Sequence, residues 1–201
     1  DSVVVGNTGT WSYTTPALPE GSNVLTIRET DPAGNQSGPS ADFTIVVDSI
    51  STTPVITSVT DNVGNTATPV ASGGETNDAT PTLSGTADAN SIVTIFDGAT
   101  QIAVVTADGT GAWSFTPETA LVEGPHAFTV QATDPQGNLS LVSAPWSVVV
   151  DLTAPTVPTL DTVSDNVPGG VTGNLTSGQA TNDNTPTISG TGQAGSTIYI
   201  M

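Results

Sequence analysis

The stretch AFTVQA at residues 127–132 alternates apolar and polar side chains, and the fold class can be derived from it. Successive side chains of a β-strand point to opposite faces, so Phe128, Val130 and Ala132 are expected on one buried face. The run WSVVV at residues 146–150 follows the same alternation. Both stretches are therefore predicted to be strands that bury one face in a hydrophobic core.

Further short runs of β-branched and aromatic residues are separated by Gly, Pro, Asn and Asp, which are typical turn residues. The additional predicted strands are residues 55–60, 82–86, 92–96, 101–106 and 113–116. Asp97-Gly98-Ala99-Thr100 predicts a hairpin turn, and Trp113 is expected to be a core anchor, as is its equivalent Trp11. Seven strands without helical periodicity predict an all-β, immunoglobulin-like sandwich.

The sequence repeats itself with a period of about 103 residues. The motif VVD at residues 46–48 returns at 149–151, and TNDATPTLSGT at 76–86 returns as TNDNTPTISGT at 181–191. A period of this size corresponds to one sandwich domain. The period predicts tandem domains arranged as an extended rod.

The predicted domains are one complete copy and two halves. Residues 49–151 form the complete domain, residues 1–48 the C-terminal half of a preceding copy, and residues 152–201 the N-terminal half of the next. We expect the chain to be a window from a longer array. The alternative is that the two halves pair between molecules, since each alone exposes open sheet edges.

Charge and composition exclude several classes of function. Nineteen acidic residues oppose one arginine and no lysine, giving a formal charge of −18, so there is no basic patch for nucleic acid. No apolar run reaches the roughly 18 residues that span a bilayer, so membrane insertion is not expected. The lack of cysteine excludes disulfides and thiolate metal sites.

The loops between the predicted strands open alternately at two ends of the sandwich, which we call the upstream and downstream poles. The upstream pole, where the chain enters, is expected to contain Asp88, Asp108, Asp134 and Asn138, together with Asp48 from the linker. The downstream pole is expected to contain Asp61, Asn62, Asn77, Asp78 and Asp97, together with Asp151. Acidic residues are therefore concentrated where like charges repel most.

Two interpretations of these acidic loops remain open. Calcium binds six to eight oxygen ligands from carboxylates, Asn side chains and backbone carbonyls, which such loops supply. Alternatively, Asp and Asn favour turns through local hydrogen bonds. Pro54 and Pro155 follow the junctions and stiffen the linkers, so calcium held by a linker Asp and the next domain's loops would lock the remaining freedom.

Nothing in the sequence predicts an enzyme. No Gly-x-Ser-x-Gly elbow is present, and two carboxylates with glycosidase spacing carry little meaning among nineteen acids. His126 starts a predicted strand, which favours a core-edge or surface role. Two other functions are alternatives: glycan binding through Trp113 or Trp146, and an accessory domain of a polysaccharide-degrading enzyme.

Several motifs in register resemble a known family: residues 61–98, GAWSFTP at 111–117, ATDPQGNLS at 132–140 and VVVDLTAP at 148–155. They are similar to the bacterial Ig-like repeats of giant adhesins exported by type I secretion. The resemblance implies a non-enzymatic, extracellular spacer on the bacterial surface, with calcium at its junctions. Host glycan or receptor contact is implied only for distal repeats.

The resemblance also implies a set of calcium ligands, drawn from linkers and loops. The implied ligands are Asp31, Asp48, Asp61, Asp78, Asp88, Asp108, Asp134, Asn138, Asp151, Asp165 and Asp183.

Overall fold

The computed structural model describes residues 1–64 and 66–201, and in these ranges the secondary structure is entirely β. The chain separates into two compact units, residues 1–151 and 152–201, which are described individually. In the described ranges, the structure has no helix with the length and apolar character needed to cross a membrane. The prediction of an all-β fold is confirmed.

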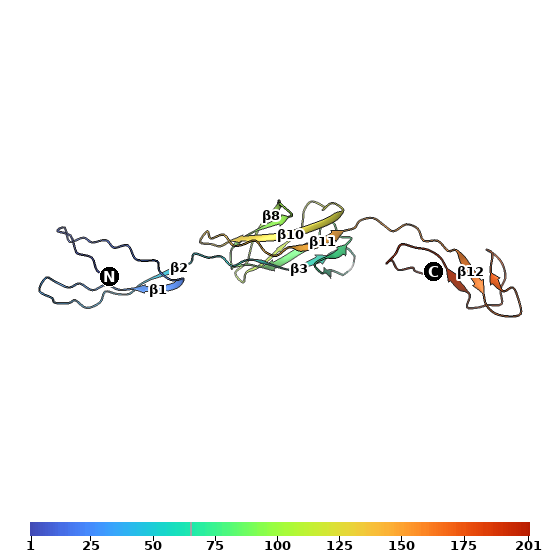
Figure 1. Ribbon diagram of the computed structural model, residues 1–201, viewed down its shortest axis with the longest axis horizontal. Helices are drawn as coiled ribbons and strands as arrows, with labels where there is room; N and C mark the ends of the chain where they lie inside the picture. The colour runs from blue at the N-terminus through green and yellow to red at the C-terminus, as the bar shows by residue number, and fades with distance from the viewer. Residues whose placement is uncertain (65) are drawn as a thin grey trace. The chain divides into compact units, whose positions relative to one another are not determined.

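Strands between Val55 and Val150 form a sandwich of two sheets, which is coloured from cyan to orange in Figure 1. One sheet has the order β4-β3-β6-β9 and the other β5-β11-β10-β7-β8. The strands of the first sheet are β3 (Val55–Asp61), β4 (Thr68–Val70), β6 (Thr82–Thr86) and β9 (Ala112–Phe115). Those of the second are β5 (Gly74–Thr76), β7 (Ile92–Asp97), β8 (Thr100–Thr106), β10 (Gly124–Thr133) and β11 (Trp146–Val150).

The prediction of seven strands was wrong by two, because β4 and β5 lie in a segment expected to be a polar loop. Each spans three residues, too short for an alternation to be visible in the sequence. Strand β4 pairs with β3, whereas β5 pairs in parallel with β11, placing Thr76 opposite Val150. The partner of β4 is the strand that precedes it, whereas the partner of β5 is distant in the chain, and the side chains of Val70 and Thr76 are buried.

The hydrophobic core lies between the two sheets, as the alternation predicted. Phe128, Val130 and Ala132 are all fully buried, and Val148 is buried beside them. Side chains of β3, β6 and β9 cover them from the opposite sheet, including Trp113. Trp113 is therefore confirmed as a core anchor.

The predicted hairpin at residues 97–100 is confirmed, with Asp97 paired to Thr100 across a two-residue loop. Gly98 has a φ of 57°, which a glycine adopts without steric cost. A positive φ at the first central residue is typical of the type II′ turn, whose twist matches that of the flanking strands. The turn places Asp97 at the end of β7.

The partial copies form smaller sheets with their core positions exposed. In residues 1–48, β1 (Gly21–Leu25) pairs with β2 (Phe43–Val47). In residues 152–201, β12 (Thr162–Asp165) pairs with β13 (Gly173–Asn174) and β14 (Thr187–Ser189).

Trp11 corrects the prediction that both tryptophans are core anchors. Its side chain is 49% exposed, whereas that of Trp113 is 4% exposed. Trp113 lies on β9 against the second sheet, but no strand forms around Trp11 in the structure. Burial of an aromatic side chain requires an opposing layer, which residues 1–48 do not provide for Trp11. The predicted domain limits at residues 48 and 151 and the rod arrangement stay predictions.

Candidate functional site

The upstream pole is assembled from three loops of the sandwich. The amide of Ala87 donates to the carbonyl of Gly111 at 2.9 Å, and the amide of Asn90 donates to that of Asp108 at 3.2 Å. These bonds join the β6–β7 and β8–β9 loops. The third loop, between β10 and β11, begins with Asp134.

The linker preceding the sandwich is hydrogen-bonded to two of these loops. The amide of Thr52 donates to Asp88 Oδ2 at 2.7 Å, and Asn138 Nδ2 donates to the carbonyl oxygen of Asp48 at 3.1 Å. The structure therefore brings Asp48, Asp88 and Asn138 to one pole, as the loop alternation predicted. Here Asp88 acts through its carboxylate, whereas Asp48 contributes a backbone carbonyl.

Asp134 organises the turn that carries Asn138. Its Oδ1 accepts the amides of Gln136 and Asn138 at 2.9 and 2.8 Å, and its Oδ2 accepts Asn138 Nδ2 at 2.8 Å. Asp31 holds Asn35 with the same pair of contacts in the preceding copy. The Asp-Pro-x-Gly-Asn motif is thus a self-contained turn, formed identically in both copies.

The hydrogen bonds of these turns lower the pKa of the aspartates that accept them. Burial raises the pKa of Asp134, but the bonds from the side chain and backbone of Asn138 and from Gln136 outweigh it, and the pKa lies below its ordinary value. The side chain of Asn35 lowers the pKa of Asp31. The hydroxyl and amide of Thr110 lower the pKa of Asp108 in the same way. These carboxylates therefore stay ionised well into the acidic range.

The downstream pole contains a second network, centred on Asp61 and Asp78. Asp61 accepts the amide of Val63 and the hydroxyl of Thr76, both at 2.7 Å. Asp78 Oδ2 accepts the amide of Asn62 at 2.7 Å. Both aspartates are buried, and hydrogen-bond donors compensate their charges.

The next copy repeats this network with Asp165 and Asp183. Thr181 donates its hydroxyl to Asp165, and the amide of Asn166 donates to Asp183 Oδ2 at 3.1 Å. The amides of Asn166 and Thr185 lower the pKa of Asp183. Two separate units thus contain the same buried arrangement, which makes it a property of the repeat.

Asp151 lies beside the first of these networks. An open hollow of about 280 Å³ is lined by Asp61, Glu75, Thr76, Asn77 and Asp151, and the amide of Asp151 donates to the carbonyl of Thr76 at 2.9 Å. Every one of these side chains carries oxygen, the ligand type that calcium prefers. Across residues 1–64 and 66–201, however, no three acidic or histidine side chains converge on a metal position.

Both interpretations of the acidic loops can now be compared with the geometry. The turn interpretation is confirmed for Asp61, Asp78, Asp108 and Asp134, whose carboxylates accept local amides. A carboxylate has about four acceptor positions, so such turns keep lone pairs for a cation. The donor set therefore fits calcium only with Asn, Thr and backbone oxygens completing the shell, and calcium binding stays a prediction.

The turn at Asp134 leads to a test by pH. Asp134→Ala should lower the urea midpoint of the full chain at pH 7, because the turn amides lose their acceptor. A carboxylate with a lowered pKa stabilises the fold above its unfolded pKa, and this contribution is lost as pH falls through the folded value. Urea titrations at pH 7 and pH 2.5 should show the difference from wild type shrinking in acid. The exposed Glu118→Ala provides the control, and an equal deficit for Asp134→Ala at both pH values would contradict the assignment.

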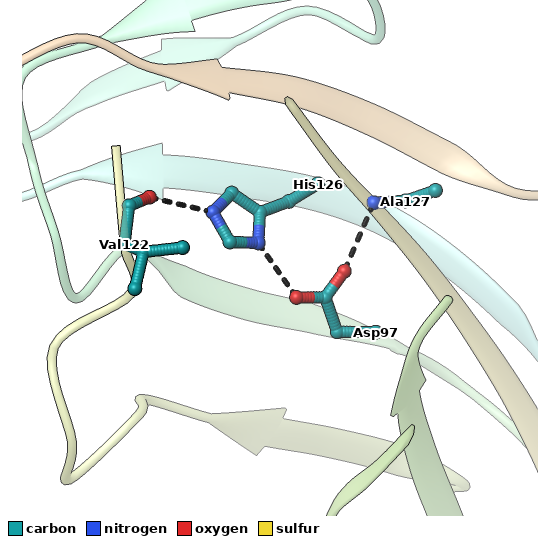
Figure 2. Close-up of polar contacts among 4 residues, drawn as sticks. All are labelled: Asp97, Val122, His126 and Ala127. Atoms are coloured by element: carbon teal, nitrogen blue, oxygen red, sulfur yellow. Dashed lines mark hydrogen bonds and ion pairs between the residues drawn. The ribbon is translucent and has the colours of Figure 1, made fainter. Parts of the chain in front are cut away.

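The sequence did not predict the ionic contact at His126, which Figure 2 shows. His126 Nδ1 lies 2.6 Å from Asp97 Oδ2, and Nε2 lies 2.8 Å from the carbonyl oxygen of Val122. Asp97 Oδ1 also accepts the amide of Ala127 at 3.1 Å. The core-edge position predicted for His126 is confirmed, but its partner depends on the register of β7 and β10, which no local pattern reveals.

The tryptophans weighed as glycan platforms lie inside the sandwich. Trp113 is buried and Trp146 is half-buried against the core. Their indole N–H groups are buried and have no hydrogen-bond partner among the described residues. Stacking on a sugar requires an accessible ring face and an accessible donor, so no glycan site is assigned to either residue.

The fold and its pole turns define the class of immunoglobulin-like modules, and comparison of the sequence gives the family. The pattern described as bacterial Ig-like domain matches residues 1–49 and 65–152, well over half of the chain. The chain therefore belongs to the bacterial Ig-like domain family, a family of non-catalytic domains. Each matched range ends at the residue that follows a Val-Val-Asp motif. Among curated proteins, none matches this chain.

Proposed function

We propose that this chain is a repeat segment of a bacterial surface adhesin, in which Ig-like domains act as spacers and calcium ions stiffen their junctions. Its setting is extracellular: a giant adhesin exported by type I secretion, which serves attachment to host cells or biofilm growth. The observation that carries the proposal is the linker between residues 48 and 52, bonded to the loops at Asp88 and Asn138. A linker held by its own domain is what a stiff spacer requires.

The ligands proposed at the upstream junction are oxygen atoms of Asp48, Asp88, Asp134 and Asn138. Asp88 and Asn138 are already held within hydrogen-bond distance of the linker, so little chain movement is needed to enclose an ion. The ligands proposed at the downstream pole are oxygen atoms of Asp61, Asp78 and Asp151. The equivalent proposed ligands in the next copy are Asp165 and Asp183. Calcium, when bound, supplies charge compensation and links the linker to the loops.

Asp48→Asn tests the upstream junction. Replacing a charged ligand with a neutral one is expected to weaken calcium binding by about tenfold or more while the sandwich stays folded. Isothermal titration of calcium into the full chain measures the affinity, and circular dichroism checks the fold. Asp42→Asn is the matched control, because Asp42 is exposed and lies outside both poles. Equal affinities for the two variants and wild type would refute the side chain of Asp48 as a ligand.

Stiffening requires its own measurement. Small-angle scattering of the full chain with calcium, and again after chelation, reports the maximum dimension in each state. The proposal expects a larger dimension with calcium. An unchanged dimension, together with measurable calcium binding, would leave a calcium-binding spacer whose rigidity comes from Pro54, Pro155 and the linker hydrogen bonds.

A further inference from the structure

His126 is held between two groups that can only accept hydrogen bonds. The carbonyl oxygen of Val122 faces Nε2 at 2.8 Å, and the carboxylate of Asp97 faces Nδ1 at 2.6 Å (Figure 2). A neutral imidazole carries one N–H and can satisfy only one of these acceptors. Both contacts together therefore require the doubly protonated imidazolium.

The surroundings of the ring favour this charged form. Burial by itself lowers the pKa of His126, but the bond to Val122 and the bond to and charge of Asp97 outweigh it, and the pKa lies above its ordinary value. Phe128 stacks on the ring with centroids 6.0 Å apart, and Val148 on β11 is the register partner of His126. Titratable residues on the neighbouring segments are all acidic: Asp97 at the end of β7, Glu118 and Glu123 before β10, and Asp151 after β11.

The contacts of His126 connect three segments at the downstream pole. Val122 belongs to the segment between β9 and β10, and Asp97 ends β7. The same segment is joined to the β5–β6 loop by the amide of Leu121, which donates to the carbonyl of Ala79 at 2.8 Å. Loss of the imidazolium would therefore loosen residues 116–123 beside the loop that contains Asp78.

The preceding copy makes the equivalent contact without a titratable group. By the repeat period, Asn23 takes the position of His126 and Pro19 that of Val122. Asn23 Nδ2 donates to the carbonyl oxygen of Pro19 at 2.9 Å. The contact to the segment before the strand is thus common to both copies, while the ionisable version belongs to the complete domain.

We propose that His126 and Asp97 form a proton-controlled latch that fastens residues 116–123 to the downstream pole of this repeat. With the proton bound, both ring nitrogens donate and the latch is closed. When the proton leaves for solvent, the remaining N–H stays with the Asp97 carboxylate, the stronger acceptor, and Nε2 becomes an acceptor facing the Val122 carbonyl, so the contact to residues 116–123 opens. Repeats with asparagine at this position keep the segment fastened at all pH values.

The amino-acid composition allows the titration of His126 to be followed without interference from other side chains. The chain has one histidine, no cysteine and no lysine, so between pH 5.5 and 8.5 His126 is the one side chain with an ordinary pKa in range. A group with a raised folded pKa stabilises fully below its unfolded pKa, about 6.5, and loses this effect as pH rises through the folded value. Between those values the unfolding equilibrium constant should rise by up to about tenfold per pH unit.

The test is a pH series on the full chain. Nuclear magnetic resonance of the single imidazole should show both nitrogens protonated above pH 6.5, and the urea midpoint should fall from pH 5.5 to 8.5. His126→Asn should remove this fall, because asparagine can still donate to Val122 as Asn23 does to Pro19. Contributions from groups that are common to both proteins cancel in this comparison.

Asp97→Asn is expected to reverse the direction in which stability changes with pH. Without the carboxylate, burial is opposed only by the weaker effect of the bond to Val122 and should lower the pKa of His126, so stability should then rise with pH between pH 5.5 and 6.5. An imidazole that titrates at or below about 6.5 in wild type would overturn the latch. An unchanged pH slope in His126→Asn would do the same, and the imidazole titration decides the matter if that variant does not fold.

Discussion

Gly85→Ala is expected to destabilise the complete sandwich by about 3 kcal/mol or more, since the added methyl group has no space. A Cβ at this position would lie 2.0 Å from the carbonyl oxygen of Val55 and 2.4 Å from Cζ2 of Trp113. Gly85 lies on β6 between β3 and β9, where its register partners are Ile56 and Trp113. Relief therefore requires moving backbone in one neighbour and a buried indole in the other.

Urea unfolding followed by tryptophan fluorescence measures this loss. Gly109→Ala is the matched control, because nothing lies within 4 Å of its Cβ position and its φ is not positive. The control should stay within about 0.5 kcal/mol of wild type. Gly190 in the next copy meets the carbonyl of Thr159 at 1.9 Å, so the close approach recurs in the repeat. Similar stabilities for both alanine variants would contradict the close approach of β6 to its two neighbouring strands at Gly85.

Phe128→Ala is expected to cost about 3–5 kcal/mol, the range for removing a buried aromatic ring and leaving a cavity. Phe128 is fully buried, lies opposite Trp146 on β11 and stacks on the His126 ring. Its loss removes core contacts between the two sheets and one support of the latch. The urea midpoint should fall at both pH 5.5 and pH 8.5, which separates this variant from those of the latch itself.

Phe43→Ala tests the same chemical change in a different environment. Phe43 is 67% exposed on β2, so its removal should change stability by less than about 1 kcal/mol. The comparison is made by urea unfolding of the full chain, with the indole N–H resonance of buried Trp113 as a specific probe of the sandwich. Equal losses in the two variants would contradict the position of the core between the two sheets.

Local patterns predicted most of the complete sandwich, because each strand's alternation is written in a few consecutive residues. Phe128, Val130 and Ala132 are buried as the period of two requires, and the hairpin at Gly98 forms where its turn residues predicted it. The repeat period also placed the equivalent turns at Asp31 and Asp134 in the same geometry. Strands β4 and β5 were not predicted because three residues are too few to show an alternation, and β5 also depends on a distant partner, β11.

The candidate site was predicted less completely. Loop alternation correctly grouped Asp48, Asp88 and Asn138 at one pole, and Asp61 and Asp78 at the other. It could not show that most of these carboxylates accept turn amides, since that depends on where each backbone N–H points. Trp113 is buried and Trp11 is exposed although their motifs are equivalent in the repeat, because only Trp113 faces an opposing sheet.

The order of residues alone is enough for the β class, the repeat and the concentration of acids in loops, because these are properties of neighbours along the chain. Folding in three dimensions adds what joins distant segments. It pairs β5 with β11, brings the linker amide of Thr52 to Asp88 and sets His126 between Asp97 and Val122. Except for the contact to Val122, these contacts arise from strand register and sheet packing, which relate residues about thirty or more positions apart and therefore leave no local signature.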